Sequence, residues 1–334
     1  MKPTLKDIAE QTGLSISTVS RILRGDSNSS KDNVEQTIHV AQRLNYPINS
    51  RLLNQQYEYK STLQVALISS FYPDEFYSAF FYGINNAAKA ENINMSYHIY
   101  TPEDENLHSL INSLSHNFID AAILFIPTLQ ESDYKEIIEN VPESFPLVSL
   151  APAFNPVIDT MTFDSYRGGH LVAKHFYDRG YKDMGIITGP HTKNEAIFRK
   201  NGFTDFINQK EDATLVWQVE GDYTFGFGKR AYQSYAKLDK KPRAIFTSND
   251  YMCLGFLEQA TRNGVNIPGD VAVAGFDDLP ACEYVHPGIT SVHTDYDILG
   301  KKAFKLLNDK ITPPHEHSGI LSVVPVTLTV RESS

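Results

Sequence analysis

The sequence predicts an all-α head of helix-turn-helix type followed by an α/β body of two doubly wound parallel-sheet subdomains. Three observations support this prediction. The first fifty residues contain three short stretches with apolar residues at helical spacing. From Leu63 onward, short apolar runs alternate with amphipathic stretches, as in parallel sheets covered by helices. The length of 334 residues also exceeds what one compact core usually holds, so two or three domains are expected.

Charge and cysteine content limit the class of protein. The chain carries 30 basic and 40 acidic residues, but residues 1–55 hold seven Lys or Arg against five Asp or Glu, a net charge of +2. This asymmetry permits a DNA-contacting head on an acidic body. Cys253 and Cys282 are too few for a disulfide framework, and no stretch approaches the roughly 20 apolar residues that a bilayer requires. The N-terminus has no apolar signal region, so we expect a cytoplasmic protein without a membrane segment.

Helix start and stop signals divide the head into three helices. Thr4 with Asp7 three places later is a capping-box variant, and Gly13 ends the helix that follows. Ser15 is a typical N-cap for a second helix, and a polar loop over 25–30 precedes the third. The first helix is expected to end at about Thr12, the second to span Ile16 to Arg24, and the third to span about Lys31 to Leu44.

The outward face of the second helix suits a DNA major groove. It carries small hydroxyls, one guanidinium and one branched apolar side chain, which are Ser17, Ser20, Arg21 and Ile16. Arginine can donate two hydrogen bonds to guanine, hydroxyls can reach phosphates or base edges, and isoleucine can contact a thymine methyl. A plain three-helix bundle with solvated Ser and Arg side chains is the alternative at this point.

The head resembles one family. The segment TLKDIAEQTGLSISTVSRIL at 4–23 is similar to the N-terminal signature of the lactose-repressor (LacI/GalR) family of bacterial transcriptional regulators, and the similarity continues through the chain. The resemblance implies that Ile16, Ser17 and Arg21 read bases. It also implies that the DNA backbone is contacted by Thr4, Ser15, Thr18, Ser20, Ser30, Asn33 and Tyr46. Ile16 and Ser17 are unusual as base readers, so the operator sequence cannot be copied from a relative.

The segment after the head, 48–61, is expected to be a hinge. Pro47 ends the third helix, and 49–60 is polar and poor in core residues. In the family this segment folds on DNA into a helix whose leucine enters the minor groove, a role that Leu52 or Leu53 would take here. The order Pro47-Ile48-Asn49 and a longer linker depart from the family pattern, and a flexible tether is the alternative.

The body is divided by its strand pattern into two subdomains. Expected strands are Val65–Ser69, Met95–Ile99, Ala121–Ile126, Leu147–Leu150, Met184–Thr188, Ala244–Thr247 and Val271–Gly275, with helices that include Phe76–Glu91, Tyr166–Arg179 and Tyr251–Arg262. The expected domains are 1–47, 48–61 and 62–334, the last split into about 62–161 plus 292–323 and about 162–291 plus 324–334. Strand C-termini of the two sheets would face a shared cleft, where such folds bind ligands.

The body resembles a periplasmic sugar-binding protein used as a sensor. The matching segments are FYSAFFYGI at 76–84, FDSYRGG at 163–169, 199–203, EGDY at 220–223, SND at 248–250, GFDD at 275–278 and ITSV at 289–292. The resemblance implies a polar clamp of Arg199, Asn249 and Asp277 on the effector, with Tyr223 stacking on it. We expect Phe76, Tyr77 or Phe71 to form the opposing wall.

One departure bears on the ligand. Sugar-sensing relatives often have an Asp where this chain has Ala151, so the cavity is expected to be more aromatic and less acidic than theirs. A neutral or acidic sugar, including an oligosaccharide, follows as the expected effector. A purine-like corepressor is an alternative.

The sequence as a whole predicts a ligand-responsive DNA-binding regulator, in the main a repressor of carbohydrate-utilisation genes. We expect a homodimer on a palindromic operator, with a tetramer left open. No catalytic, metal or cofactor motif stands at a convincing spacing, so neither an enzyme nor a metal or cofactor site is expected. The rival interpretation is a sugar-binding transport protein, which would have no use for the head. The pattern does not determine whether the effector releases or recruits DNA.

Overall fold

The structure is a computed structural model, and it describes residues 3–24, 29–44, 46, 48, 62–71, 74–101, 106–117, 119–142, 145–311 and 319–334. The hinge leucines Leu52 and Leu53 lie outside these residues. Within the described ranges, no helix has both the length and the apolar character needed to cross a membrane.

The head consists of three helices around a small core. They are α1 (Leu5–Thr12), α2 (Ile16–Arg24) and α3 (Lys31–Arg43). Thr4 and Asp7 form the expected capping box, and Gly13 ends α1 in the left-handed region at φ 70°. Ile8, Val19 and Ala41, one from each helix, are fully buried and hold the bundle together. The predicted helix-turn-helix is therefore confirmed.

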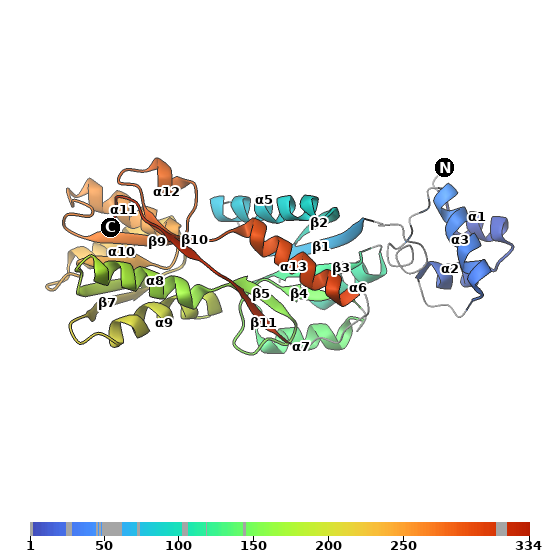
Figure 1. Ribbon diagram of the computed structural model, residues 1–334, viewed down its shortest axis with the longest axis horizontal. Helices are drawn as coiled ribbons and strands as arrows, with labels where there is room; N and C mark the ends of the chain where they lie inside the picture. The colour runs from blue at the N-terminus through green and yellow to red at the C-terminus, as the bar shows by residue number, and fades with distance from the viewer. Residues whose placement is uncertain are drawn as a thin grey trace.

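The body contains two six-stranded sheets, one per lobe (Figure 1). The N-lobe sheet has the order β11-β5-β4-β3-β1-β2 and the C-lobe sheet the order β12-β10-β9-β8-β6-β7. The N-lobe strands are β1 (Leu63–Ser69), β2 (Ile93–Ile99), β3 (Ala121–Phe125), β4 (Leu147–Ser149), β5 (Thr160–Phe163) and β11 (Leu321–Val324). The C-lobe strands are β6 (Asp183–Thr188), β7 (Thr214–Glu220), β8 (Ala244–Thr247), β9 (Ala272–Asp277), β10 (Thr290–His293) and β12 (Thr327–Thr329). All pairings are parallel except that of β10 with β12.

Helices cover both faces of each sheet. The N-lobe sheet lies between α5 (Glu75–Ala90) with α13 (Tyr296–Ile311) on one face and α6 (Leu107–His116) with α7 (Glu131–Asn140) on the other. The C-lobe sheet lies between α8 (Ser165–Asp178) with α9 (Asn194–Asn208) and α10 (Phe225–Ala236) with α11 (Asp250–Arg262), while α12 (Ala281–Tyr284) follows β9. Burial on both faces explains why the central strands are continuous apolar runs.

Three segments connect the lobes. They are the passages from β5 to α8, from β10 to α13 and from β11 to β12 (Figure 1). The seven expected strands lie within two residues of observed ones, whereas β5, β7, β10, β11 and β12 were not expected. Most of these are short or lie at a sheet edge, where polar residues interrupt the apolar pattern. The predicted fold of two parallel-sheet lobes is confirmed.

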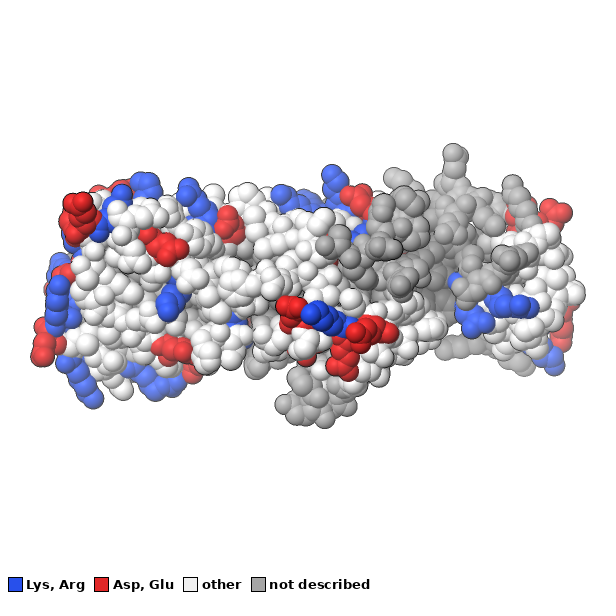
Figure 2. All heavy atoms as spheres, turned by 90° about the horizontal axis from the view of Figure 1, so that it is seen from below, with Lys and Arg blue, Asp and Glu red and all other residues white. Residues whose placement is uncertain are grey.

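Charge is mixed over the surface. Figure 2 shows one face of the molecule, on whose described part basic and acidic side chains are interspersed. The net charge of -10 is therefore not gathered into a single acidic field on this face.

Candidate functional site

Helix α2 presents its predicted reading face to the outside. Its apolar stripe of Val19, Ile22 and Leu23 is buried in the head. Ile16 is 49% exposed although it is apolar, and Arg21 is also exposed. An exposed isoleucine costs solvation free energy, which contact with an apolar partner would recover.

Most of the predicted backbone-contacting residues lie where helices begin, whereas Ser20 lies within α2 and Tyr46 follows α3. Thr4 and Ser30 are the N-caps of α1 and α3, and the Ser15 hydroxyl accepts from the Thr18 backbone N–H at 3.1 Å at the start of α2. Asn33 lies in the first turn of α3, and its backbone N–H donates to Ser30 Oγ. Helix N-termini attract phosphates because their N–H groups and dipoles point outward. Tyr46 is half-buried against the head core.

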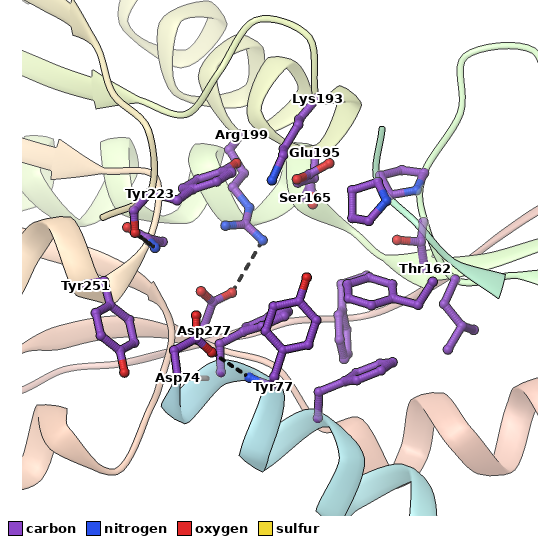
Figure 3. A pocket seen from close by; sticks show the side chains of 18 of the residues that line it. Asp74, Tyr77, Thr162, Ser165, Lys193, Glu195, Arg199, Tyr223, Tyr251 and Asp277 are labelled. Atoms are coloured by element: carbon purple, nitrogen blue, oxygen red, sulfur yellow. Dashed lines mark hydrogen bonds and ion pairs between the residues drawn. The ribbon is translucent and has the colours of Figure 1, made fainter. Parts of the chain in front are cut away.

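A cavity of about 560 Å³ lies between the two lobes (Figure 3). This volume falls in the range of sites for small organic ligands, roughly 300–1,000 Å³. Its C-lobe wall carries most of the charged and polar side chains, together with Tyr223, Phe225 and Tyr251, and its N-lobe wall carries most of the aromatic rings, together with Asp74. The polar lining includes Lys193, Glu195, Arg199, Asp222, Asn249 and Asp277, and the aromatic lining includes Phe76, Tyr77, Phe80, Phe125, Phe163 and Tyr296.

Arg199, on α9, is fixed by three contacts. Its Nη2 lies 3.3 Å from Asp277 Oδ1, its Nη1 donates to the Ser248 carbonyl, and its guanidinium lies over the Phe276 ring at 3.7 Å. Arg199 and Asp277 are both nearly fully buried. The guanidinium Nε is buried and has no hydrogen-bond partner in the described part of the chain.

The backbone is strained at two cavity residues. Asp277, at the end of β9, has φ 109°, and Tyr223, after β7, has φ 68°. Such strain persists where surrounding structure holds it, often at ligand sites. Burial raises the pKa of the Asp277 carboxyl to about 8 despite the neighbouring guanidinium. Burial also raises the pKa of Tyr223, whose hydroxyl is buried without a partner in the described chain.

Asn249 ties Tyr223 to helix α11. Its Oδ1 accepts from the Met252 backbone N–H at 3.0 Å and so caps α11, while its Nδ2 donates to the Tyr223 carbonyl at 3.0 Å. Both ends of the amide are therefore engaged within the protein. The geometry gives Asn249 a clear role in positioning Tyr223 in addition to any contact with a ligand.

Aromatic rings build the opposite wall. Phe76 and Tyr77, from the first turn of α5, meet edge to face at 5.2 Å between centroids, and Phe80 packs on Phe125 at 4.4 Å. Tyr296, at the start of α13, is edge-on to Phe76 at 6.0 Å. Such rings offer flat apolar faces to sugar rings or nucleobases.

Contacts also cross directly between the lobes. The Glu75 backbone N–H, at the start of α5, donates to Tyr251 Oη of α11 at 2.8 Å. Asn194 Nδ2 of α9 donates to the Pro152 carbonyl at 2.9 Å, and the Phe154 and Phe198 rings meet at 4.6 Å. The lobes are therefore in contact at the rim of the cavity.

The cavity brings together six of the eight expected effector residues and leaves out two. The six are Phe76, Tyr77, Arg199, Tyr223, Asn249 and Asp277. Phe71 does not line the cavity: it is 40% exposed and packs on Phe81 and Tyr77. Ala151 is buried between the lining residues Leu150 and Pro152, and its backbone bonds to Ser149 Oγ. Both expected placements are corrected by this geometry.

Sequence reasoning missed several polar residues of the cavity. Asp74, Glu195 and Asp222 bring three further carboxyl groups, so the cavity has more acidic side chains than the expectation built on Ala151 allowed. Lys193 places its Nζ 5.1 Å from the Tyr223 ring centroid. Asp74 could have been found as an N-cap before the apolar stretch at 76, and it does accept from the Tyr77 backbone N–H. Glu195 gave no such signal.

An HTH head, two lobes and a cavity between them define a class: a DNA-binding protein joined to a small-molecule sensor. Two family models match this division: "Bacterial regulatory proteins, lacI family" over residues 4–49 and "Periplasmic binding protein-like domain" over residues 173–334. Together they cover more than half of the chain.

Relatives match over nearly the whole length. The chain is 26% identical to the ribose operon repressor of Haemophilus influenzae and 23% identical to the HTH-type transcriptional repressor PurR of Histophilus somni, with 99% of this chain and 98% of each relative covered. The lac repressor dimer bound to operator and the anti-inducer ONPF superposes with a TM-score of 0.74 at 22% identity, covering 100% of this chain and 99% of that one.

The chain therefore combines a lacI-type helix-turn-helix domain with a periplasmic-binding-protein-like domain. It is a DNA-binding transcriptional regulator rather than an enzyme, because its relatives over the full length are transcriptional repressors, and these relatives do not favour the alternative of a transport protein.

Proposed function

We propose that this regulator is a cytoplasmic repressor of carbohydrate-utilisation genes that senses a sugar between its lobes. The observation that carries the proposal is the cavity whose polar side chains come mainly from one lobe and whose aromatic rings come mainly from the other. A ligand touching both walls favours the closed arrangement over an open one, and that difference in affinity is what shifts the population.

The combination of walls suits a sugar. Aromatic rings such as Phe76 pack on the apolar face of a pyranose, while Arg199, Asn249 and Asp277 exchange hydrogen bonds with its hydroxyls. The H. influenzae relative is named for ribose, which is consistent with this class of effector.

On DNA, we propose that Ile16, Ser17 and Arg21 contact base edges in the major groove. We propose that the phosphates are contacted by Thr4, Ser15, Thr18, Ser30 and Asn33 near helix starts, and by Ser20 within α2 and Tyr46 after α3. One small head makes few contacts, so we propose a homodimer on a palindromic operator. Large apolar side chains are exposed on α5 and the sheet edge β2, namely Tyr82, Tyr97 and Ile99, and they offer a dimer surface.

The test pairs operator selection with ligand screening of the full-length protein. A random duplex library is selected for bound sequences, and the protein is screened by thermal shift against neutral sugars, sugar acids, sugar phosphates and nucleobases. A ligand that binds the native state raises the melting temperature. Enrichment of a palindrome, together with a sugar that changes affinity for it, supports the proposal. Binding without sequence preference under all conditions refutes it.

Asp277→Asn tests the coupling between cavity and operator. We expect the variant to bind the selected operator as the wild type does but to lose the response to the ligand, with ligand affinity reduced by about tenfold or more. The reason is that the change removes an acceptor from the cavity without touching the head. Gel-shift titrations with and without ligand measure both properties. Retained ligand affinity with lost operator binding would contradict the assignment.

A further inference from the structure

The cavity contains one carboxyl group that is not committed to the protein. Glu195 lies in the first turn of α9, and its Oε2 is buried without a hydrogen-bond partner in the described part of the chain, although the residue as a whole is partly exposed. Figure 3 shows its side chain directed into the cavity beside Lys193 and Arg199. A buried carboxyl oxygen without a hydrogen-bond partner costs free energy. The Glu195 side chain in this position therefore points to a hydrogen-bond donor on a bound ligand.

The other carboxyl groups of the cavity already have partners. Asp277 is paired with Arg199, Asp222 with Arg230 at 2.9 Å, and Asp74 accepts from a backbone N–H of α5. Among the carboxyl groups of the cavity, Glu195 is therefore the one with a buried oxygen that lacks a partner in the described part of the chain.

The cavity offers an anionic ligand few free cationic donors. Arg199 already bonds Asp277 and the Ser248 carbonyl, and Lys193 is the other cationic side chain of the described lining. Burial raises the pKa of Glu195, of Asp74 and of Asp277, so negative charge is already unfavourable among the four carboxyl groups of this cavity, and an anionic ligand would meet the same penalty with only these two cations beside it.

We infer that Glu195 makes this cavity selective for neutral ligands that donate an O–H or N–H hydrogen bond, and that it discriminates against sugar acids and sugar phosphates. This inference rests on the proposed sensing function and narrows it, because the sequence left neutral and acidic sugars equally open. Glu195 accepts from a ligand donor, and an anionic group in the same place would put a second negative charge beside an acidic group whose pKa burial already raises.

Full-length wild-type protein is titrated in parallel with neutral and anionic ligands at matched ionic strength. The probes are ribose, glucose, cellobiose and hypoxanthine as neutral ligands, and ribose 5-phosphate, glucuronate and glucose 6-phosphate as anionic counterparts. We expect at least one neutral probe to bind, and its anionic counterpart to bind at least about tenfold more weakly. Glu195→Gln should narrow that difference, since the amide keeps an acceptor but loses the charge. Glu211→Gln, on an exposed turn of the same lobe, is the matched control and should leave it unchanged.

A second measurement needs no ligand. If Glu195 is held for a ligand, Glu195→Gln should leave the melting temperature of the free protein unchanged or raise it, because a buried unpaired carboxyl is removed. A clear fall in the melting temperature would show that Glu195 stabilises the fold by balancing the charges of Arg199 and Lys193, and it would overturn the inference.

The outcomes separate this inference from the proposed function. If glucuronate binds more tightly than glucose, the inferred selectivity for neutral ligands is refuted but the proposed sugar sensing is not. If only hypoxanthine binds, the proposed sugar sensing is refuted but the inferred selectivity for neutral ligands is not. Failure of every probe to bind, or identical selectivity in wild type and Glu195→Gln, counts against the inference itself.

Discussion

The Arg21 side chain leaves α2 on its exposed face, where its Nε lies 3.4 Å from the Ser17 carbonyl. Arg24 leaves the same helix one turn later, with the same charge and a similar contact to Ser20. A comparison of substitutions at Arg21 and Arg24 can therefore distinguish a base-specific contact from the general attraction of positive charge to DNA.

Arg21→Ala should weaken operator binding by about 1–3 kcal/mol and relax base preference at one position of each half-site. The reason is that arginine bidentate to guanine supplies both affinity and discrimination. Arg24→Ala removes an equal charge and should lower affinity for all sequences alike. Competition gel shifts with single-base operator variants measure both effects. Equal preference profiles for wild type and Arg21→Ala would remove Arg21 from the base readers.

Asp250 should make the stability of the protein depend on pH. It is fully buried, accepts from Ser291 Oγ at 2.6 Å and from the Leu279 backbone N–H at 2.9 Å, and burial raises its pKa to about 7. Between about pH 4, near the pKa of an unfolded Asp, and pH 7, the folded protein holds a proton that the unfolded chain has released. The free energy of unfolding from this group therefore falls as pH rises, by up to about 1.4 kcal/mol per pH unit.

Asp250→Asn should flatten this dependence. Urea unfolding at pH 5, 6 and 7 gives the slope, and the variant slope should be less negative than that of the wild type. Asp239→Asn, at an exposed turn, is the control for loss of one carboxyl group. An Asp250→Asn slope equal to that of the wild type would show that Asp250 is ionised in the folded protein.

Sequence patterns predicted the polar clamp better than the rest of the cavity. Arg199, Asn249 and Asp277 lie in segments that match the family, so the resemblance could assign them. Glu195 could not be assigned, because its importance depends on burial and on the absence of a partner, which are properties of the folded molecule. Phe71 was misplaced for the same reason, since a ring after a strand points either into or away from a cleft depending on the turn.

At the scale of elements, close approach of helices positions the clamp. A Cβ on Gly202 of α9 would lie 1.8 Å from the Tyr166 carbonyl of α8, and one on Gly169 of α8 would lie 2.0 Å from the Arg199 carbonyl. These glycines let α9, which carries both Glu195 and Arg199, lie directly against α8. Periodicity predicted α8 but not how near its neighbour lies, because that distance depends on pairs of residues from different helices.

The contact between α5 and α11 should contribute to lobe closure. Tyr251→Phe removes the hydroxyl that accepts from the Glu75 backbone N–H. A hydrogen bond of this kind contributes about 0.5–1.5 kcal/mol net, so ligand affinity should fall by up to about tenfold. Calorimetric titration with the ligand identified by screening measures the change.

Tyr284→Phe is the control for this prediction, because its side chain is 82% exposed and does not line the cavity. An unchanged affinity in Tyr251→Phe would mean that the interlobe bond forms equally in the open and closed states.

At the scale of the whole molecule, the order of elements was predictable, but several short strands were not. Alternating apolar runs identified the central strands, but β11 and β12 lie at sheet edges and contain exposed residues such as Val323. The chain passes from one sheet to the other between these two strands, beside the expected subdomain boundary at 323/324. Edge strands bury only part of one face, which is why their pattern is weak.

The exposed apolar surface of the N-lobe connects this architecture to DNA affinity. Phe71, Tyr97 and Ile99 are 40%, 43% and 63% exposed, and ring contacts join Phe71 and Tyr97 through Phe81. A contiguous apolar patch of this kind beside the edge strand β2 is typical of an interface between subunits. If two copies meet there, each operator half-site receives one head.

Ile99→Lys should therefore dissociate the dimer and weaken binding to the palindromic operator by about tenfold or more, while a single half-site is bound as before. Buried in a two-fold interface, the lysine charge would lose its solvation without a partner. Sedimentation velocity measures the mass, and gel shifts on whole and half operators measure the affinity. Ile320→Lys makes the same change beside β11, at the opposite edge of the same sheet, and should remain dimeric. A dimeric Ile99→Lys variant would place the interface on another surface.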